Sequence, residues 1–133
     1  MITIKKALII GNIDNGISHA TSSQLLIKEG YDVHMVPSSN AGLQQLDAQD
    51  YDLIIVQESP EAQSWQLCEK IRHLSGMPLI VISPNASADT CVKAINAGAD
   101  YFLRKPFGPL EFIARVQSLL QRTAQNQPAP IGM

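Results

Sequence analysis

The stretch Asp52-Leu53-Ile54-Ile55-Val56-Gln57 contains an unbroken run of aliphatic side chains, rich in β-branched isoleucine and valine. A short run without polar alternation is typical of a strand that is covered on both faces, as in a parallel sheet. Further apolar runs recur along the chain at a steady interval. They are Ala7–Ile10, Val33–Val36, Leu79–Ile82 and a weaker Tyr101–Leu103.

Segments of helical length separate these runs. They are Ser18–Glu29, Ser39–Gln49, Glu61–Ser75, Ser87–Ala97 and Leu110–Arg122. The order of strand then helix, repeated five times, predicts an α/β fold: a doubly wound, flavodoxin-like parallel sheet of five strands in the order 2-1-3-4-5, with five helices. Ligands of such sheets bind beyond the carboxyl ends of the strands, so the functional residues are expected there.

The composition indicates one globular domain. The chain has 133 residues, of which 45% are apolar and 17% charged, and a chain of this size buries ~70% of its unfolded surface. No apolar run reaches the ~18–20 residues that cross a bilayer, and the run Ala7–Gly11 is too short for the core of a signal peptide. We therefore expect a cytoplasmic protein with no membrane contact.

The charge of the chain argues against a nucleic-acid-binding domain, and the spacing of its cysteines and histidines argues against a metal site. The formal net charge is −2 and the ten Lys and Arg residues are spread along the chain, so we expect no direct nucleic-acid contact by this domain. Cys68, Cys91 and three scattered histidines lack metal-ligand spacing, so we expect no metal and no cofactor. Residues 1–123 are expected to form the domain, and 124–133, rich in Gln, Asn and Pro, a linker or disordered tail.

One motif identifies a family. The stretch Ala97-Gly98-Ala99-Asp100-Tyr101-Phe102-Leu103-Arg104-Lys105-Pro106-Phe107 resembles the closing motif of CheY-like response-regulator receiver domains. Asp52–Val56 resembles their third strand, Pro78–Ser83 their fourth and Glu29–Val33 the entry to their second. The resemblance covers residues 5 to 122. It implies a receiver fold and, in the family, transfer of a phosphoryl group from a histidine kinase to an aspartate with the help of Mg²⁺.

The residues depart from the family at the centre of that chemistry. Gln57 stands where the phosphoaccepting aspartate is expected, and an amide is a poor nucleophile that cannot form an acyl phosphate. Gly11 and Asn12 stand where the acidic pair follows the first strand, provided that Ala7–Ile10 stays inside the sheet. The other register puts Asp14 in the acid position, although Asp14 also suits a turn. One uncertain carboxylate does not predict a Mg²⁺ site.

The readout residues of the family are retained. Ser83 matches the switch hydroxyl, Lys105 the switch ammonium and Phe102 the aromatic side chain that reorients on activation. Ser83 can also be a simple loop hydroxyl, and Phe102 a core residue. Without an acidic pocket, Lys105 is expected to bond to the Gln57 amide oxygen, to Asp14 or to a backbone carbonyl. The resemblance further implies a cis peptide bond before Pro106.

A possible dimer face follows from the same resemblance. Receivers attached to winged-helix DNA-binding domains pair through the fourth helix, fifth strand and fifth helix, and Asp100, Glu111 and Arg115 match charges of that face. Tyr101 and Cys91 stand where that subfamily has an acid and a base, so the charge set is incomplete. The alternative is that the three residues are solvated surface charges, each worth well under ~1 kcal/mol.

The sequence therefore predicts a degenerate receiver domain, or pseudo-receiver, that is not an enzyme. We expect it to act in signal transduction and transcription regulation through a protein partner, either a second copy or an output domain. Two alternatives remain: a working phosphoreceiver that uses Glu58 or Asp14, and a small-molecule-binding flavodoxin-like module.

Overall fold

The computed structural model describes residues 4–11, 22–58, 65–84 and 87–125 of the 133-residue chain. Asn12 and Asp14 lie outside these ranges. The strands are β1 (Lys6–Gly11), β2 (Asp32–Val36), β3 (Leu53–Gln57), β4 (Leu79–Ser83) and β5 (Tyr101–Arg104). The helices are α1 (Ser22–Lys28), α2 (Ser39–Ala48), α3 (Trp65–Leu74), α4 (Ala88–Asn96) and α5 (Pro109–Gln125).

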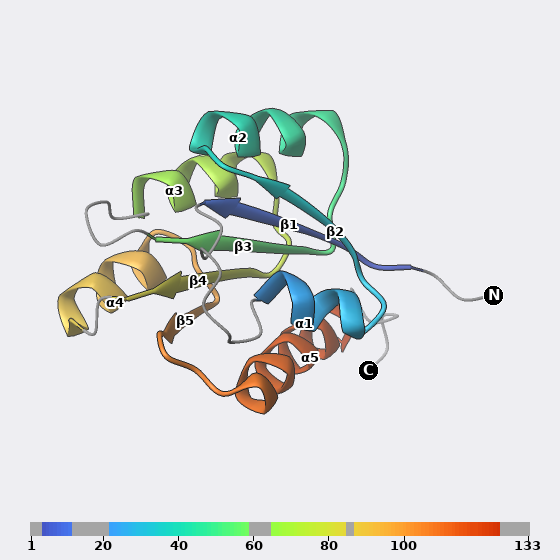
Figure 1. The fold of residues 1–133 in the computed structure, drawn as a ribbon. Coiled ribbons are helices and arrows are strands. Elements are labelled where there is room, and N and C mark those ends of the chain that lie inside the picture. Colours follow the sequence, from blue (N-terminus) through green and yellow to red (C-terminus); the bar gives the residue numbers. More distant parts are fainter. Residues whose placement is uncertain (1–3, 12–21, 59–64, 85–86, 126–133) are drawn as a thin grey trace, which may run out of the picture.

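The strands form one parallel sheet in the order β2-β1-β3-β4-β5, which confirms the predicted topology (Figure 1). In the centre of the sheet, Ala7 pairs with Leu53 and Gly11 with Gln57. Ala7–Ile10 is at most 1% exposed. This confirms the register that keeps the first apolar run inside the sheet, and it places Gly11 at the carboxyl end of β1.

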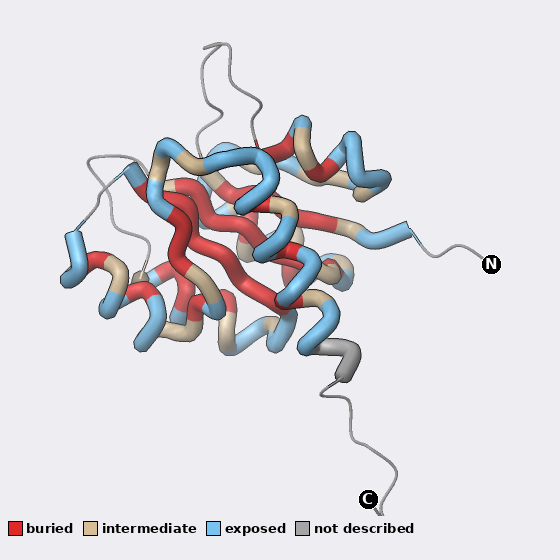
Figure 2. The backbone as a smooth tube through the Cα atoms, turned by 90° about the horizontal axis from the view of Figure 1, so that it is seen from below, coloured by how far each residue is buried: buried red, intermediate tan, exposed pale blue. Residues whose placement is uncertain are grey.

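The helices cover both faces of the sheet, so the central strands β1, β3 and β4 are almost entirely buried (Figure 2). On one face α1 and α5 pack through Leu26, Phe112 and Val116 against inward side chains such as Ile9 and Ile55. On the other face α2, α3 and α4 pack through Leu46, Ile71 and Ala94. Each such side chain, fully buried, contributes ~1.5–3 kcal/mol through removal of apolar surface from water.

The last helix is longer than the sequence predicts. Helix α5 continues to Gln125 instead of ending at Arg122, because no proline interrupts the chain until Pro128. The helix thus crosses the predicted boundary at residues 123 and 124, and the division into a domain and a tail stays a prediction. Within the described ranges, no helix is both long and apolar enough to span a bilayer.

Candidate functional site

Four of the predicted site residues lie at the carboxyl ends of the strands: Gly11, Gln57, Ser83 and Lys105. Gly11 ends β1 beside Gln57, which ends β3. Ser83 ends β4 beside Arg104, and the Lys105 backbone N–H donates to the Ser83 carbonyl oxygen over 2.9 Å. Parallel pairing therefore places Gln57, Ser83 and Lys105 on neighbouring strand ends, as the sequence predicts.

The Gln57 side chain is turned into the protein at this edge. Gln57 is 9% exposed and Ser22, in the first turn of α1, is 2% exposed. Gln57 Nε2 donates to Ser22 Oγ over 2.7 Å. Gln57 Oε1 is buried, and among the residues that the structure describes it has no hydrogen-bond partner. The amide nitrogen therefore ties β3 to α1.

The unpartnered oxygen corrects one expectation about Lys105. Because Gln57 Oε1 accepts no hydrogen bond, Lys105 does not donate to the amide oxygen. Lys105 is half-buried and has another interaction partner. The peptide bond that follows it, Lys105–Pro106, is cis, which confirms the geometry implied by the resemblance.

The other readout residues are packed inside the domain. Ser83 is fully buried and engaged in an interaction of its own. Phe102 is 7% exposed and belongs to the core on the α2, α3 and α4 face of the sheet. This placement agrees with the packing interpretation of Phe102. Whether either side chain switches anything stays a prediction.

The end of β1 has no room for an acidic side chain. Gly11 has a φ of +128°, a backbone conformation that residues with a Cβ atom rarely adopt. A Cβ atom built there would overlap the Gln57 carbonyl oxygen and lie 3.2 Å from Gln57 Cβ. The close approach of β1 and β3 therefore requires glycine at the position where the family has its first acid.

The described residues do not fit the Mg²⁺ ion that the fold family implies. Mg²⁺ is held by hard oxygen ligands that include one or two carboxylates, whereas Gly11 and Gln57 supply none. Among the residues that the structure describes, no group of three His, Cys, Asp or Glu side chains could hold a metal ion. The nearest acid in sequence, Glu58, is half-buried, and its N–H donates to the Ile82 carbonyl oxygen over 2.8 Å.

The predicted dimer-face charges have intramolecular contacts. Asp100 Oδ2 accepts from Arg72 Nη2 at 2.7 Å and from the Leu79 N–H at 2.8 Å. The Arg115 guanidinium carbon lies 4.7 Å from the centre of the Tyr101 ring. Glu111 is exposed in the first turn of α5. Two of these partners, Arg72 for Asp100 and Ser22 for Gln57, carry no signal in the sequence.

Comparison with known proteins agrees with this geometry. Residues 13–117 match the model of the response regulator receiver domain. The chain is 30% identical over 112 residues to the uncharacterized transcriptional regulatory protein YclJ of Bacillus subtilis, covering 83% of this chain and 49% of that protein. It is 36% identical over 106 residues to the transcriptional regulatory protein CutR of Streptomyces coelicolor, covering 77% and 48%.

Solved structures show the same fold. A CheY-like receiver domain protein from Methanospirillum hungatei superposes with a TM-score of 0.81 at 26% identity, covering 94% of this chain and all of that one. The chain spans about half the length of the curated relatives it matches. The family match, the strand order and the cis peptide before Pro106 agree, and the chain belongs to the response-regulator receiver domain family.

Proposed function

We propose that this chain is a pseudo-receiver, which signals through protein–protein contacts and does not depend on aspartyl phosphorylation or on Mg²⁺. Gln57 at the end of β3 is the observation that carries the proposal. A carboxylate oxygen has to attack phosphorus in phosphoryl transfer to a receiver, and an amide whose nitrogen donates to Ser22 Oγ has no such oxygen.

The environment of Gln57 supports the same conclusion. Phosphoryl transfer needs a cation that neutralises the charge of the transferring group, and Mg²⁺ is held by carboxylates. Gly11 cannot be replaced by a residue that supplies a carboxylate, because a Cβ atom there would overlap Gln57. In this proposal the site keeps the shape of a receiver site and has lost its covalent chemistry, so binding, not catalysis, is the activity of the domain.

We further propose that the domain works in the cytoplasm as part of a transcription regulator. The matched relatives from Bacillus and Streptomyces are described as transcriptional regulatory proteins. The contact face in this proposal comprises α4, β5 and α5, and its partner is an output domain or a second copy. Val92 and Ile95 on α4 are 54% and 41% exposed, so α4 offers two apolar side chains to a partner.

The decisive experiment is a phosphorylation assay by intact-protein mass spectrometry. The protein is treated with acetyl phosphate and Mg²⁺, beside a receiver that has the usual aspartate as the assay control. We expect no stoichiometric mass gain on the pseudo-receiver. A stoichiometric, acid-labile phosphoryl adduct would overturn the proposal. Glu58→Gln and Asp14→Asn variants would then show which carboxylate accepts the group.

The contact face is tested separately. Val92→Asp and Ile95→Asp each replace an apolar side chain of α4 by a charge, and both side chains are already exposed, so the fold is expected to persist. Binding of an output domain should weaken about tenfold or more if the face is used, because a charge would be desolvated there without a partner. Unchanged binding in both variants would exclude this face.

A further inference from the structure

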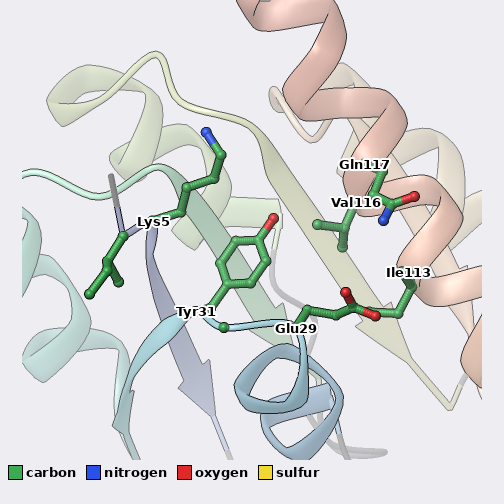
Figure 3. Close-up of a pocket in the computed structure, with 8 residues that line it drawn as sticks. Lys5, Glu29, Tyr31, Ile113, Val116 and Gln117 are labelled. Carbon is green, nitrogen blue, oxygen red and sulfur yellow. The ribbon is translucent and has the colours of Figure 1, made fainter. Parts of the chain in front are cut away.

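A hollow lies near the amino ends of β1 and β2, at the opposite end of the strands from Gln57. It has a volume of about 320 Å³. Ile4 and Lys5 before β1, Glu29 and Tyr31 around the turn into β2, and Ile113 and Val116 of α5 line it. In Figure 3 the Tyr31 ring lies between Lys5 and the side chains of α5. Neither the family chemistry nor the α4, β5 and α5 face uses this hollow.

The floor of the hollow is apolar and its rim carries an exposed aliphatic side chain. Val116 is 1% exposed, and Ile113 and Tyr31 are half-buried. Burial, followed by the charges of Asp52 and Glu29, raises the pKa of the Tyr31 hydroxyl, so the ring is neutral at physiological pH. Ile4 at the rim is 64% exposed. An apolar side chain in water therefore stands beside an apolar hollow.

The rim also carries two opposite charges. Lys5 and Glu29 both line the hollow and are both exposed. Within the described part of the chain, neither side chain forms an ion pair. A ligand with one charge would satisfy only one of these two groups. A surface of the same composition would satisfy both, because it presents a carboxylate to Lys5 and an ammonium to Glu29.

We propose that a second copy of this chain covers the hollow in a two-fold symmetric dimer. In such an interface residue i meets residue j and residue j meets residue i. Lys5 then pairs with Glu29 of the partner subunit, and Glu29 with Lys5 of the partner subunit. Ile4 of each copy packs on the apolar floor of the other. The proposal goes beyond the proposed function, because it uses α5 and the α1–β2 turn and needs no part of α4.

Charge reversal tests the pairing. Sedimentation equilibrium of the chain at low ionic strength should show a dimer. Lys5→Glu brings two carboxylates together at both symmetric contacts, as Glu29→Lys brings two ammonium groups together, and each should raise the dimer dissociation constant about 100-fold. The double variant Lys5→Glu/Glu29→Lys restores both pairs with the signs exchanged, so it should dimerise again. Ile4→Asp should give a monomer.

Two controls make the result specific to this surface. Lys70 is exposed on α3, at the other face of the sheet. Lys70→Glu changes the net charge by the same amount as Lys5→Glu, and it should leave the dimer intact. Val92→Asp should also leave it intact. A wild-type monomer at millimolar concentration would overturn the proposal. So would a dimer insensitive to the single reversals, a double variant that stays monomeric, or a dimer lost in Val92→Asp alone.

The two proposals fail independently. A phosphoryl adduct in the mass assay would refute the pseudo-receiver and would leave the dimer intact. A monomer in sedimentation would refute the dimer and would leave the chemistry of Gln57 as argued above.

Discussion

The Gln57 side-chain nitrogen lies 2.7 Å from Ser22 Oγ, and this hydrogen bond joins the end of β3 to the first turn of α1. Both side chains are buried. The bond therefore lies in an environment where a lost partner is not replaced fully by water, so its removal should be measurable.

A double-mutant cycle measures the interaction between the Gln57 amide and the Ser22 hydroxyl. Ser22→Ala should lower the free energy of unfolding by about 1–3 kcal/mol, because both polar atoms of the Gln57 amide are then buried without partners. Gln57→Met in the same background removes the amide at nearly constant volume and should recover most of that loss. Urea denaturation of the four proteins measures both values. Ser22→Ala is made both in the wild type and in the Gln57→Met variant. If it lowers the free energy of unfolding equally in both, residues 22 and 57 do not interact.

Gly42 of α2 should not tolerate a methyl group. A Cβ atom there would overlap Ile10 Cδ1 and lie 2.6 Å from Ile10 Cγ1. Alanine gains about 1 kcal/mol of helix propensity over glycine, but overpacking against a buried strand costs ~1–3 kcal/mol. We expect Gly42→Ala to lower the melting temperature. Gly76→Ala, in the loop after α3 with nothing within 4 Å of its Cβ atom, is the control for an added methyl group without overlap, and an equal shift in both variants would contradict the packing argument.

Arg72 should be irreplaceable by lysine. Its guanidinium donates to the carbonyl oxygens of Gly98 at 2.7 Å, Met77 at 2.6 Å and Ser75 at 3.3 Å, in addition to Asp100. A lysine ammonium is a point donor and cannot span these acceptors.

Arg72→Lys is therefore expected to lose nearly as much unfolding free energy as Arg72→Met, about 2–4 kcal/mol. Chemical denaturation compares the two variants. A lysine variant as stable as the wild type would show that charge alone, through Asp100, is what Arg72 contributes.

Alkaline pH should destabilise the domain through its tyrosines. Burial, then Asp52 and Glu29, raises the pKa of Tyr31, and burial, then Asp32, raises that of Tyr51. The folded chain then holds these phenolic protons more tightly than the unfolded chain, so the stabilisation is fully present below the ordinary tyrosine pKa of 10.0 and is lost as pH rises through the folded pKa values.

Urea midpoints between pH 8 and pH 11 test this, with absorbance at 295 nm to follow ionisation. Tyr31→Phe should show a shallower decline with pH than the wild type. A steeper decline, or one unchanged in Tyr31→Phe and Tyr51→Phe, would contradict the assignment.

Local patterns were sufficient to predict the sheet and the position of Gln57 in it. The aliphatic runs of β1, β3 and β4 are strands whose side chains are buried on both faces, and the register of Ala7–Ile10 follows from that burial. The same register places Gly11 beside Gln57. These inferences needed only periodicity and the topology rules of parallel sheets.

Contacts between distant residues had no signal in the sequence. Ser22 lies 35 residues from Gln57, in a polar stretch where any of several hydroxyl groups could have met the amide. Asp100 matches a charge of the family's dimer face, and its carboxylate also accepts from Arg72, 28 residues away. Tyr101 replaces an acid of the family and instead lies under Arg115. Side-chain pairing of this kind depends on tertiary packing, which a linear pattern does not encode.

The close approach of Gly11 to Gln57 also limits how an acidic site could be built at these strand ends. Gln57→Asp would place a carboxylate at the end of β3, but an acid at position 11 would force the two strand ends apart. A carboxylate on each strand end therefore requires a backbone change in addition to two substitutions.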